Sequence, residues 1–246
     1  MRLSTVLNVK RIKLRNRIFT LGFIITGMLS LAFGVVTFYG QNAGNFVMSV
    51  DTAARLRGIS LTEDPTDPID PQNMENRGLL PRLMSDPVNE ARDVTYAWLK
   101  LDEIQNTNGN FTDIDHDYVA YTFYLINDGS ETVDVNYYIR LTEIYSNLDT
   151  AVRILVIQDG VQHMYMREDV VLDGEEAPYY PAIMPDPEYF LTDNTVMRSV
   201  ITNFKPGDDI KFSVVVWLEG YDPDCTDDVL GGMIKMVMIF AINGME

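Results

Sequence analysis

The feature that most constrains the fold is a set of short segments in which apolar and polar residues alternate. In TVDVNYYIRLTEI (132–144), one side of the alternation is apolar and the other is mostly polar. The apolar side consists of Val133, Val135, Tyr137, Ile139 and Leu141. Successive side chains of a β-strand point to opposite faces, so this pattern predicts a strand that buries one face.

A turn signal joins two more segments of this kind. AVRILVI (151–157) and VQHMYMR (161–167) flank Gln158-Asp159-Gly160. Asp-Gly between two strand-like runs favours a tight hairpin, because both residues tolerate the positive φ that such a turn requires. We therefore expect residues 151–167 to form a β-hairpin.

The other segments complete an all-β pattern. Strong candidates are DYVAYTFYLIN (117–127), DIKFSVVVWLEG (209–220) and GMIKMVMIFAIN (232–243), and we also expect strands at 45–51, 55–61 and 94–104. Roughly nine strands with hairpin and longer connections are typical of a sandwich and not of alternating βαβ units. The predicted fold is an all-β, jelly-roll-like antiparallel β-sandwich over residues 45–246. Two proline-rich stretches, 62–92 and 173–190, interrupt the pattern and are expected to be long excursions from the sheets.

The N-terminal region has a different character. Residues 1–17 contain six basic residues and no acid, and residues 18–40 carry no charge over 23 positions. A bilayer requires about 20 apolar residues in a helix, and basic residues before such a helix keep the N-terminus in the cytoplasm. We expect a membrane-inserting helix and an extracytoplasmic domain. Two alternatives stay open: an h-region cleaved by signal peptidase near Ala32 and Gly34, or an uncleaved anchor.

The charge of the chain excludes one class of partner. Its formal net charge is −17 at pH 7. An acidic surface repels a phosphate backbone, so we expect no nucleic-acid binding. Cys225 is the single cysteine of the chain and has no intrachain disulfide partner, so the stability of the fold must come from its hydrophobic core.

Catalytic motifs are not evident. The two histidines, His116 and His163, form no HExxH motif, no C-x-x-C exists, and no G-x-S-x-G elbow is present. These absences remove the usual signals of a zinc site and of an α/β-hydrolase nucleophile. We predict no catalytic residues, with a hydrolase that uses an unrecognised pair of carboxylates as an alternative.

Two acidic clusters are candidate calcium sites, calcium being the one cofactor considered. Asp113, Asp115 and Asp117 alternate in FTDIDHDY, and Asp222, Asp224 and Asp227 lie in DPDCTDD. Carboxylate oxygens suit calcium, which takes six to eight oxygen ligands. Neither cluster has the glycine and terminal glutamate of an EF-hand loop, so a plain acidic loop is the alternative for the first, and an acidic turn or short capped helix for the second.

Several of these segments together resemble a known family. They are GNFVMSVD (44–51), DYVAYTFYLINDGSETVDVNYYI (117–139), FKPGDDIKFSVVVWLEGYDPDC (204–225) and GGMIKMVMIFAI (231–242). The combination is similar to the exported camelysin/TasA group of biofilm-matrix proteins of Gram-positive bacteria. The resemblance implies a jelly-roll domain outside the cell that forms fibres with itself or with related matrix proteins. The metallopeptidase activity assigned to camelysin is not carried over, because a metallopeptidase ligand set is not recognisable.

In TasA-like fibres the segment after the signal peptide completes the sandwich of the next subunit. The matching segment here is 45–51, with Phe46, Met48 and Val50 on one face. Strand addition to an open sheet edge supplies main-chain hydrogen bonds and side-chain pockets. The alternative is an ordinary first strand of its own domain. We therefore expect an exported structural protein, with a membrane-anchored module that binds glycan or calcium as the alternative.

Overall fold

The computed structural model describes residue 26 and residues 46–65, 79–88, 91–169 and 184–242. Residues 44–246 form one compact unit, separate from residues 1–43. Of the uncharged segment 18–40, Thr26 alone is described, and it is helical. In the described part of the chain, no helix combines the length and the apolar character needed to cross a membrane.

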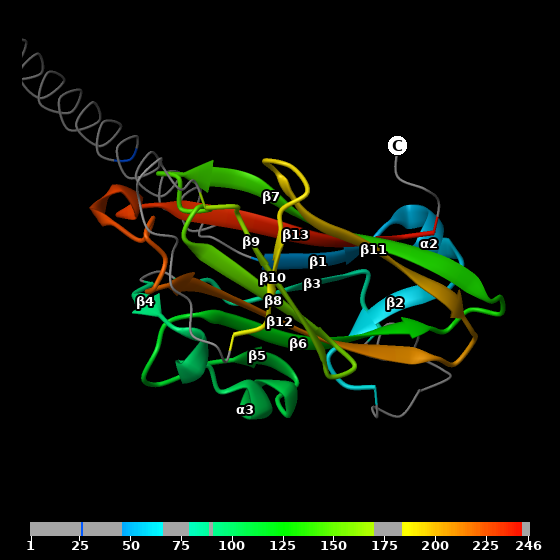
Figure 1. Ribbon diagram of the computed structural model, residues 1–246. Coiled ribbons are helices and arrows are strands. Elements are labelled where there is room, and N and C mark those ends of the chain that lie inside the picture. Colours follow the sequence, from blue (N-terminus) through cyan, green and yellow to red (C-terminus); the bar gives the residue numbers. More distant parts are fainter. Residues whose placement is uncertain (1–25, 27–45, 66–78, 89–90, 170–183, 243–246) are drawn as a thin grey trace, which may run out of the picture. The chain divides into compact units, whose positions relative to one another are not determined.

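Two β-sheets build the second unit, as predicted for an all-β sandwich (Figure 1). The five-stranded sheet runs, in spatial order, β11 (Thr195–Phe204), β7 (Val133–Tyr145), β13 (Met233–Ala241), β1 (Phe46–Val50) and β3 (Arg82–Met84). The main path of the eight-stranded sheet is β10 (Pro187–Tyr189), β9 (Val161–Met166), β8 (Val152–Gln158), β12 (Asp209–Glu219), β6 (Val119–Asn127) and β2 (Ile59–Thr62). Two short strands, β4 (Asp93–Val94) and β5 (Gly109–Phe111), pair with β12 and β6.

The main core lies between the sheets and confirms the predicted strand faces. All five apolar residues predicted to share one face of β7 are buried in it. At its centre the Phe123 and Phe212 rings stack with centroids 5.5 Å apart, and the edge of Phe240 meets Phe123 at 6.1 Å. Aromatic pairs in these geometries add stabilisation to their large buried area. The alternating pattern therefore identified the residues that hold the two sheets together.

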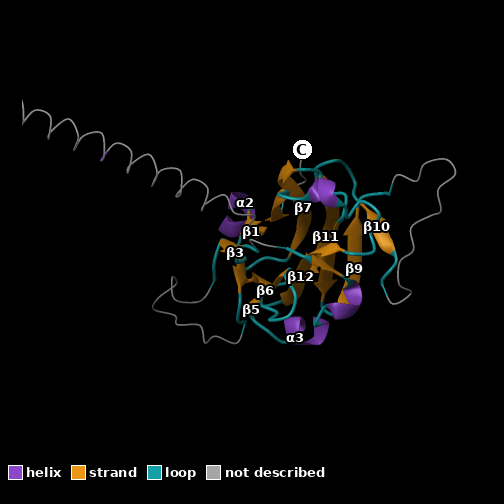
Figure 2. Cartoon of the chain, turned by 90° about the vertical axis from the view of Figure 1, so that its left-hand side faces the viewer, coloured by secondary structure: helices purple, strands orange, loops and turns teal. Residues whose placement is uncertain are grey.

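A second core covers the outer face of the eight-stranded sheet. Val215 and Trp217 of β12 are buried there against Leu99 and Ile104. The predicted strand 94–104 is wrong over most of its length: only Val94 belongs to a strand, β4, and a 3-10 helix η2 (Tyr96–Trp98) and the helix α3 (Leu101–Gln105) follow it. In the helix, Leu101 and Ile104 are spaced three apart and both pack on this core, which a strand would not allow. Figure 2 shows α3 below the strands, near β5 and β6.

The predicted strand 55–61 is also partly wrong. Helix α2 (Thr52–Leu56) precedes β2, and the Asp51 carboxylate caps it by accepting a 2.6 Å hydrogen bond from the Ala54 amide. An aspartate at this position satisfies an amide that has no partner within the helix. The chain leaves the helix through Gly58 at φ +89°, a conformation that favours glycine.

The sheets are not purely antiparallel. Strand β1 pairs in parallel with β13, β10 with β9, and β4 with β12. Two short strands lie within the proline-rich stretches that were expected to leave the sheets: β10 within 173–190 and β3 within 62–92. Residues 66–78, 89–90 and 170–183 lie outside the described part.

Strand β11 was not predicted. The predicted hairpin between β8 and β9 is confirmed, with Asp159 and Gly160 at φ 48° and 85°.

Candidate functional site

Strand β1 carries the predicted self-assembly residues, and in the single chain it lies within its own domain. It is held on both sides, in parallel by β13 with Met48 opposite Met238, and antiparallel by β3 with Met48 opposite Leu83. The side chains of Phe46, Met48 and Val50 are buried in the main core. The pattern of alternate buried residues is therefore as predicted, and the strand completes this core.

Both ends of β1 are fastened by the same neighbouring segment. The Phe46 amide donates to Ser85 Oγ at 3.2 Å, and the Ser85 amide donates to the Phe46 carbonyl at 2.9 Å. At the other end the Val50 amide donates to the Pro81 carbonyl at 2.9 Å. Exchange of this strand between copies, predicted from the resemblance, stays a prediction.

The first acidic cluster is organised around a lysine. Lys100 Nζ lies 2.7 Å from Asp113 Oδ1 and 3.1 Å from Asp115 Oδ2. Asp113 also accepts hydrogen bonds from the Asp115 amide at 2.9 Å and from the Tyr118 hydroxyl at 3.0 Å. The ammonium group supplies at these two carboxylates the positive charge that a calcium ion would bring. This arrangement supports the plain acidic loop here, and Asp117 does not share the lysine contact.

The same contacts set the protonation of Asp113, whose side chain is fully enclosed. Burial on its own raises the pKa of Asp113, but the hydrogen bonds from Lys100, the Asp115 amide and Tyr118 outweigh it and lower the pKa to about 2. A carboxylate that accepts several hydrogen bonds and faces a cation is stabilised in its charged form. Asp113 is therefore a permanent anion at neutral pH.

A pocket of about 330 Å³ opens beside this cluster. Its walls are residues 86–88, which follow β3, and residues 110–113 and 116–120, which run from β5 into β6. The Asp86 amide donates to Asn110 Oδ1 at 2.7 Å and joins the two walls. The His116 ring stacks on Trp98 with centroids 5.1 Å apart, and its Nδ1 atom lies 3.6 Å from Asp113 Oδ2. Asp113, His116 and Asp117 thus line a formed pocket, which sequence reasoning did not foresee.

The second acidic cluster divides between two places. Asp222 and Asp224 join Asp169, from the chain after β9, in a group whose ligand oxygens lie within 4.8 Å of one another. Asp227 begins the short helix η3 (Asp227–Val229), capped by Thr226. The capped-helix alternative is therefore confirmed for Asp227, and the remaining candidate metal group contains Asp169 in its place.

A buried cation already faces this group. Arg153 on β8 is fully buried, and its guanidinium lies 2.5 Å from Asp222 Oδ2. Burial raises the pKa of Asp222, and the charge of Arg153 opposes that effect. The pair balances its own charge in a region of low dielectric. The geometry therefore assigns Asp222 to a structural ion pair that anchors the β12–β13 connection.

The rest of that connection is also structural. Glu219, fully buried, accepts hydrogen bonds from Trp217 Nε1 at 2.8 Å and from the Tyr221 amide at 3.2 Å. Cys225 is free and half-buried. Burial, followed by the nearby acids Asp93, Asp222 and Glu219, raises the pKa of the Cys225 thiol. A thiol with a raised pKa is a poor nucleophile at neutral pH, so Cys225 is poorly suited to nucleophilic attack.

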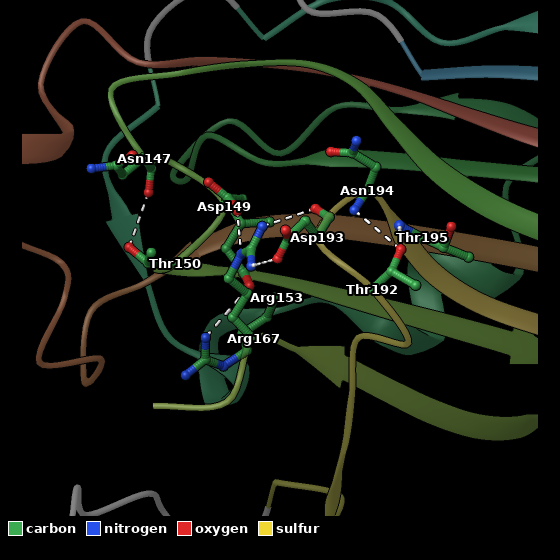
Figure 3. A network of polar contacts seen from close by, with 10 residues as sticks. Asn147, Asp149, Thr150, Arg153, Arg167, Thr192, Asp193, Asn194 and Thr195 are labelled. Atoms are coloured by element: carbon green, nitrogen blue, oxygen red, sulfur yellow. Dashed lines mark hydrogen bonds and ion pairs between the residues drawn. The ribbon is translucent and has the colours of Figure 1, made fainter. Parts of the chain in front are cut away.

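A third polar network ties the two sheets together (Figure 3). Arg167, which follows β9, forms ion pairs with Asp149 in the β7–β8 turn and with Asp193 in the β10–β11 turn. Its guanidinium also donates to the Asp193 carbonyl at 2.8 Å. His163 of β9 lies 2.8 Å from Glu188 of β10, as a sheet residue paired across strands. These contacts link neighbouring strands and turns, and none of them presents a nucleophile.

Comparisons with known proteins identify no family. No family model matches the chain, and no curated protein matches it. Among solved structures, a β-glucosidase from Kluyveromyces marxianus is similar at a TM-score of 0.23 and 10% identity, over 76% of this chain and 16% of that chain. Similarity at this level carries no argument about fold or function.

Proposed function

We propose that this chain is an exported structural protein of the cell surface or biofilm matrix that forms fibres by exchanging β1 between copies. The observation that carries the proposal is the setting of β1. Three of its five side chains fill the main core, and both of its edges are hydrogen-bonded. Its covalent link to the following strand is the short segment 51–58. The same strand of a second copy would make the same contacts, so the exchange conserves nearly all of the interaction energy.

The segment 51–58 has the properties of a hinge. Its helix α2 is a single short turn, and Leu56 is 83% exposed. An open cleft of about 660 Å³ lies beside it, lined by residues 55–58 and 128–131 among others. Within this segment Ala54 is the one residue buried in the main core, so opening the segment is expected to cost less than removing the three buried side chains of β1.

Two further features support the proposal. The chain passes repeatedly between the sheets: β1, β3, β7, β11 and β13 belong to one sheet, and the strands between them belong to the other. Such crossings are typical of a jelly roll, the fold that we assign to this sandwich. The basic segment 1–17 and the uncharged segment 18–40 support export, with the membrane and signal peptidase as the partners of this region. The proposal includes no catalytic role.

Cross-linking between strands tests the exchange. Ser49 and Ile239 are register partners on the outward face of β1 and β13, and paired strand positions suit a disulfide. Two chains are prepared on a Cys225→Ser background, one with Ser49→Cys and one with Ile239→Cys. They are mixed, assembled and oxidised. Exchange predicts a disulfide-linked dimer of the two different chains on a non-reducing gel, since the single cysteines meet only across copies.

The double variant provides the matched control. With Ser49→Cys and Ile239→Cys in one chain, oxidation before assembly locks β1 in its own domain. The locked protein is expected to form no fibres by negative-stain microscopy until a reductant opens the bridge. A chain with Thr202→Cys, on the far strand of the same sheet, should not cross-link to Ser49→Cys. Fibres formed by the locked protein without reductant would contradict strand exchange.

A further inference from the structure

The pocket beside His116 is a built cavity with an aromatic floor. Phe111 and Tyr118 stack with ring centroids 6.4 Å apart and an interplanar angle of 21°. Tyr118 and Ala120 also belong to the second core, where they are 5% and 2% exposed. The floor is therefore held in place by the packing of the sheet, and the pocket is formed before any ligand arrives.

The rim of the pocket carries negative charge beyond that of Asp113. Asp113 is already balanced by Lys100. Asp86 and Asp117 also line the pocket, and within the described residues neither carboxylate belongs to an ion pair. Two carboxylates beside an aromatic floor suit an organic cation, because the carboxylates attract its charge and the rings offer an apolar surface to its carbon chain.

The arrangement does not favour a metal ion. Within the described residues, the one group of three ligand-type side chains whose atoms converge is Asp169, Asp222 and Asp224, away from this pocket. Calcium requires six to eight oxygens around one point. The carboxylates of the pocket instead lie around a cavity of about 330 Å³, which has room for a ligand of several heavy atoms.

We propose that this pocket binds a small organic cation with a primary ammonium group. The ammonium group lies between Asp86 and Asp117, and the carbon chain rests on Phe111 and Tyr118. For a ligand of about seven heavy atoms, a dissociation constant on the order of 0.1–1 mM is expected. This inference does not rest on the proposed fibre formation, since no residue of β1 lines the pocket.

The test compares two ligands of equal length. The full chain, purified in a non-ionic detergent, is titrated by calorimetry with 1,5-diaminopentane and with the uncharged 1,5-pentanediol. The expected result is saturable binding of the diamine and at least about tenfold weaker binding of the diol, because the rim carboxylates act on the charge. Equal affinities for the two ligands, or no saturation with the diamine up to about 20 mM, would overturn the proposal.

Three variants locate the site. Asp86→Asn and Asp117→Asn are each expected to weaken diamine binding about fivefold or more. Asp102→Asn, on the exposed face of α3 and outside the pocket, is the matched control and should leave binding unchanged. Circular dichroism verifies that each variant is folded. Equal binding by all three variants would overturn the assignment, and so would displacement of the diamine by an equimolar amount of calcium chloride, which would identify a metal site.

Discussion

Arg153 shows how a single charged residue is accommodated in this core. Its side chain is fully buried on β8, and its partner Asp222 lies 69 positions further along the chain. A buried ion pair balances the desolvation of its two charges with their attraction, whereas one charge left alone is strongly destabilising. The pair therefore constrains both the β8 strand and the β12–β13 connection.

We predict that Arg153→Met lowers the free energy of unfolding by about 3–5 kcal/mol, because it leaves Asp222 buried without its cation. Urea denaturation measures the change. The matched control is Glu143→Gln, which removes the surface pair with Lys235 and is expected to cost less than about 1 kcal/mol. A loss from Arg153→Met no larger than that of the control would show that water reaches Asp222.

Asp113 predicts a dependence of stability on pH. Its pKa is lowered from 3.8 to about 2 in the folded chain, so the folded state binds the proton less tightly than the unfolded state. The contribution of Asp113 to the stability of the fold is therefore fully present above about pH 4 and is lost as the pH falls towards 2. Because solvent screens the interaction with Lys100, we expect Asp113 to contribute about 1 kcal/mol to the free energy of unfolding.

The measurement compares wild type with Asp113→Asn by urea denaturation between pH 2 and 5. The difference between the two proteins should be constant above about pH 4 and should shrink below it. Asp102→Asn, an exposed substitution on α3, serves as the control for a general loss of negative charge. A difference that stays constant down to pH 2 would contradict the lowered pKa of Asp113.

At the scale of elements, two glycines with similar backbone conformation differ in their surroundings. Gly160, in the β8–β9 turn, has φ +85° and no atom within 4 Å of an added Cβ. Gly58, between α2 and β2, has φ +89°, and an added Cβ would lie 2.3 Å from the Gly129 amide nitrogen. Only the second position combines backbone strain with a steric clash.

We predict that Gly160→Ala lowers the free energy of unfolding by about 1 kcal/mol, the penalty for an alanine in the left-handed region. Gly58→Ala should cost about 2–4 kcal/mol, because the backbone around Gly129 must also move. Thermal or urea denaturation of both variants checks the difference. Equal losses would show that the contact between residues 58 and 129 relaxes without cost.

The sequence predicted the elements whose side chains alternate over most of the strand. Strands β7 and β13 and the β8–β9 hairpin follow the two-residue period or a turn dipeptide, so their faces and ends could be anticipated. Strand β11 could not, because its register against β7 shifts between Thr195 and Met197 and again between Ile201 and Phe204. Such irregularities break the alternation on which the prediction depends. Helix α3 was missed because five residues are too few to show a helical period.

The sites were predicted only as far as local composition allows. The acidic loop of Asp113 and Asp115 is visible in the sequence, but its partner Lys100 is not, since α3 and the following turn bring the two together. In the same way, no local signal joins Asp169 to Asp222. Long-range pairs of this kind depend on strand order, which the sequence alone did not reveal.

At the scale of the whole molecule, β1 is the strand that the proposed exchange moves from one copy to the next. A chain that lacks residues 45–51 should lose most of its stability and all fibre formation, because a groove lined by β13 and β3 opens into the main core. A synthetic peptide of residues 44–51 should restore the thermal transition, and a scrambled peptide of the same composition should not. Recovery with the scrambled peptide would contradict a specific groove, and fibres of the deleted chain would contradict the role of β1.

The pairing of β1 with β13 also has a consequence for the time course of folding. The first described strand of the domain, β1, pairs with the last, β13. Contacts of such high sequence separation form slowly, so the apolar face of β1 is expected to be covered late in folding. Under the proposed exchange, β13 of a neighbouring copy competes during that time with the chain's own β13 for this strand.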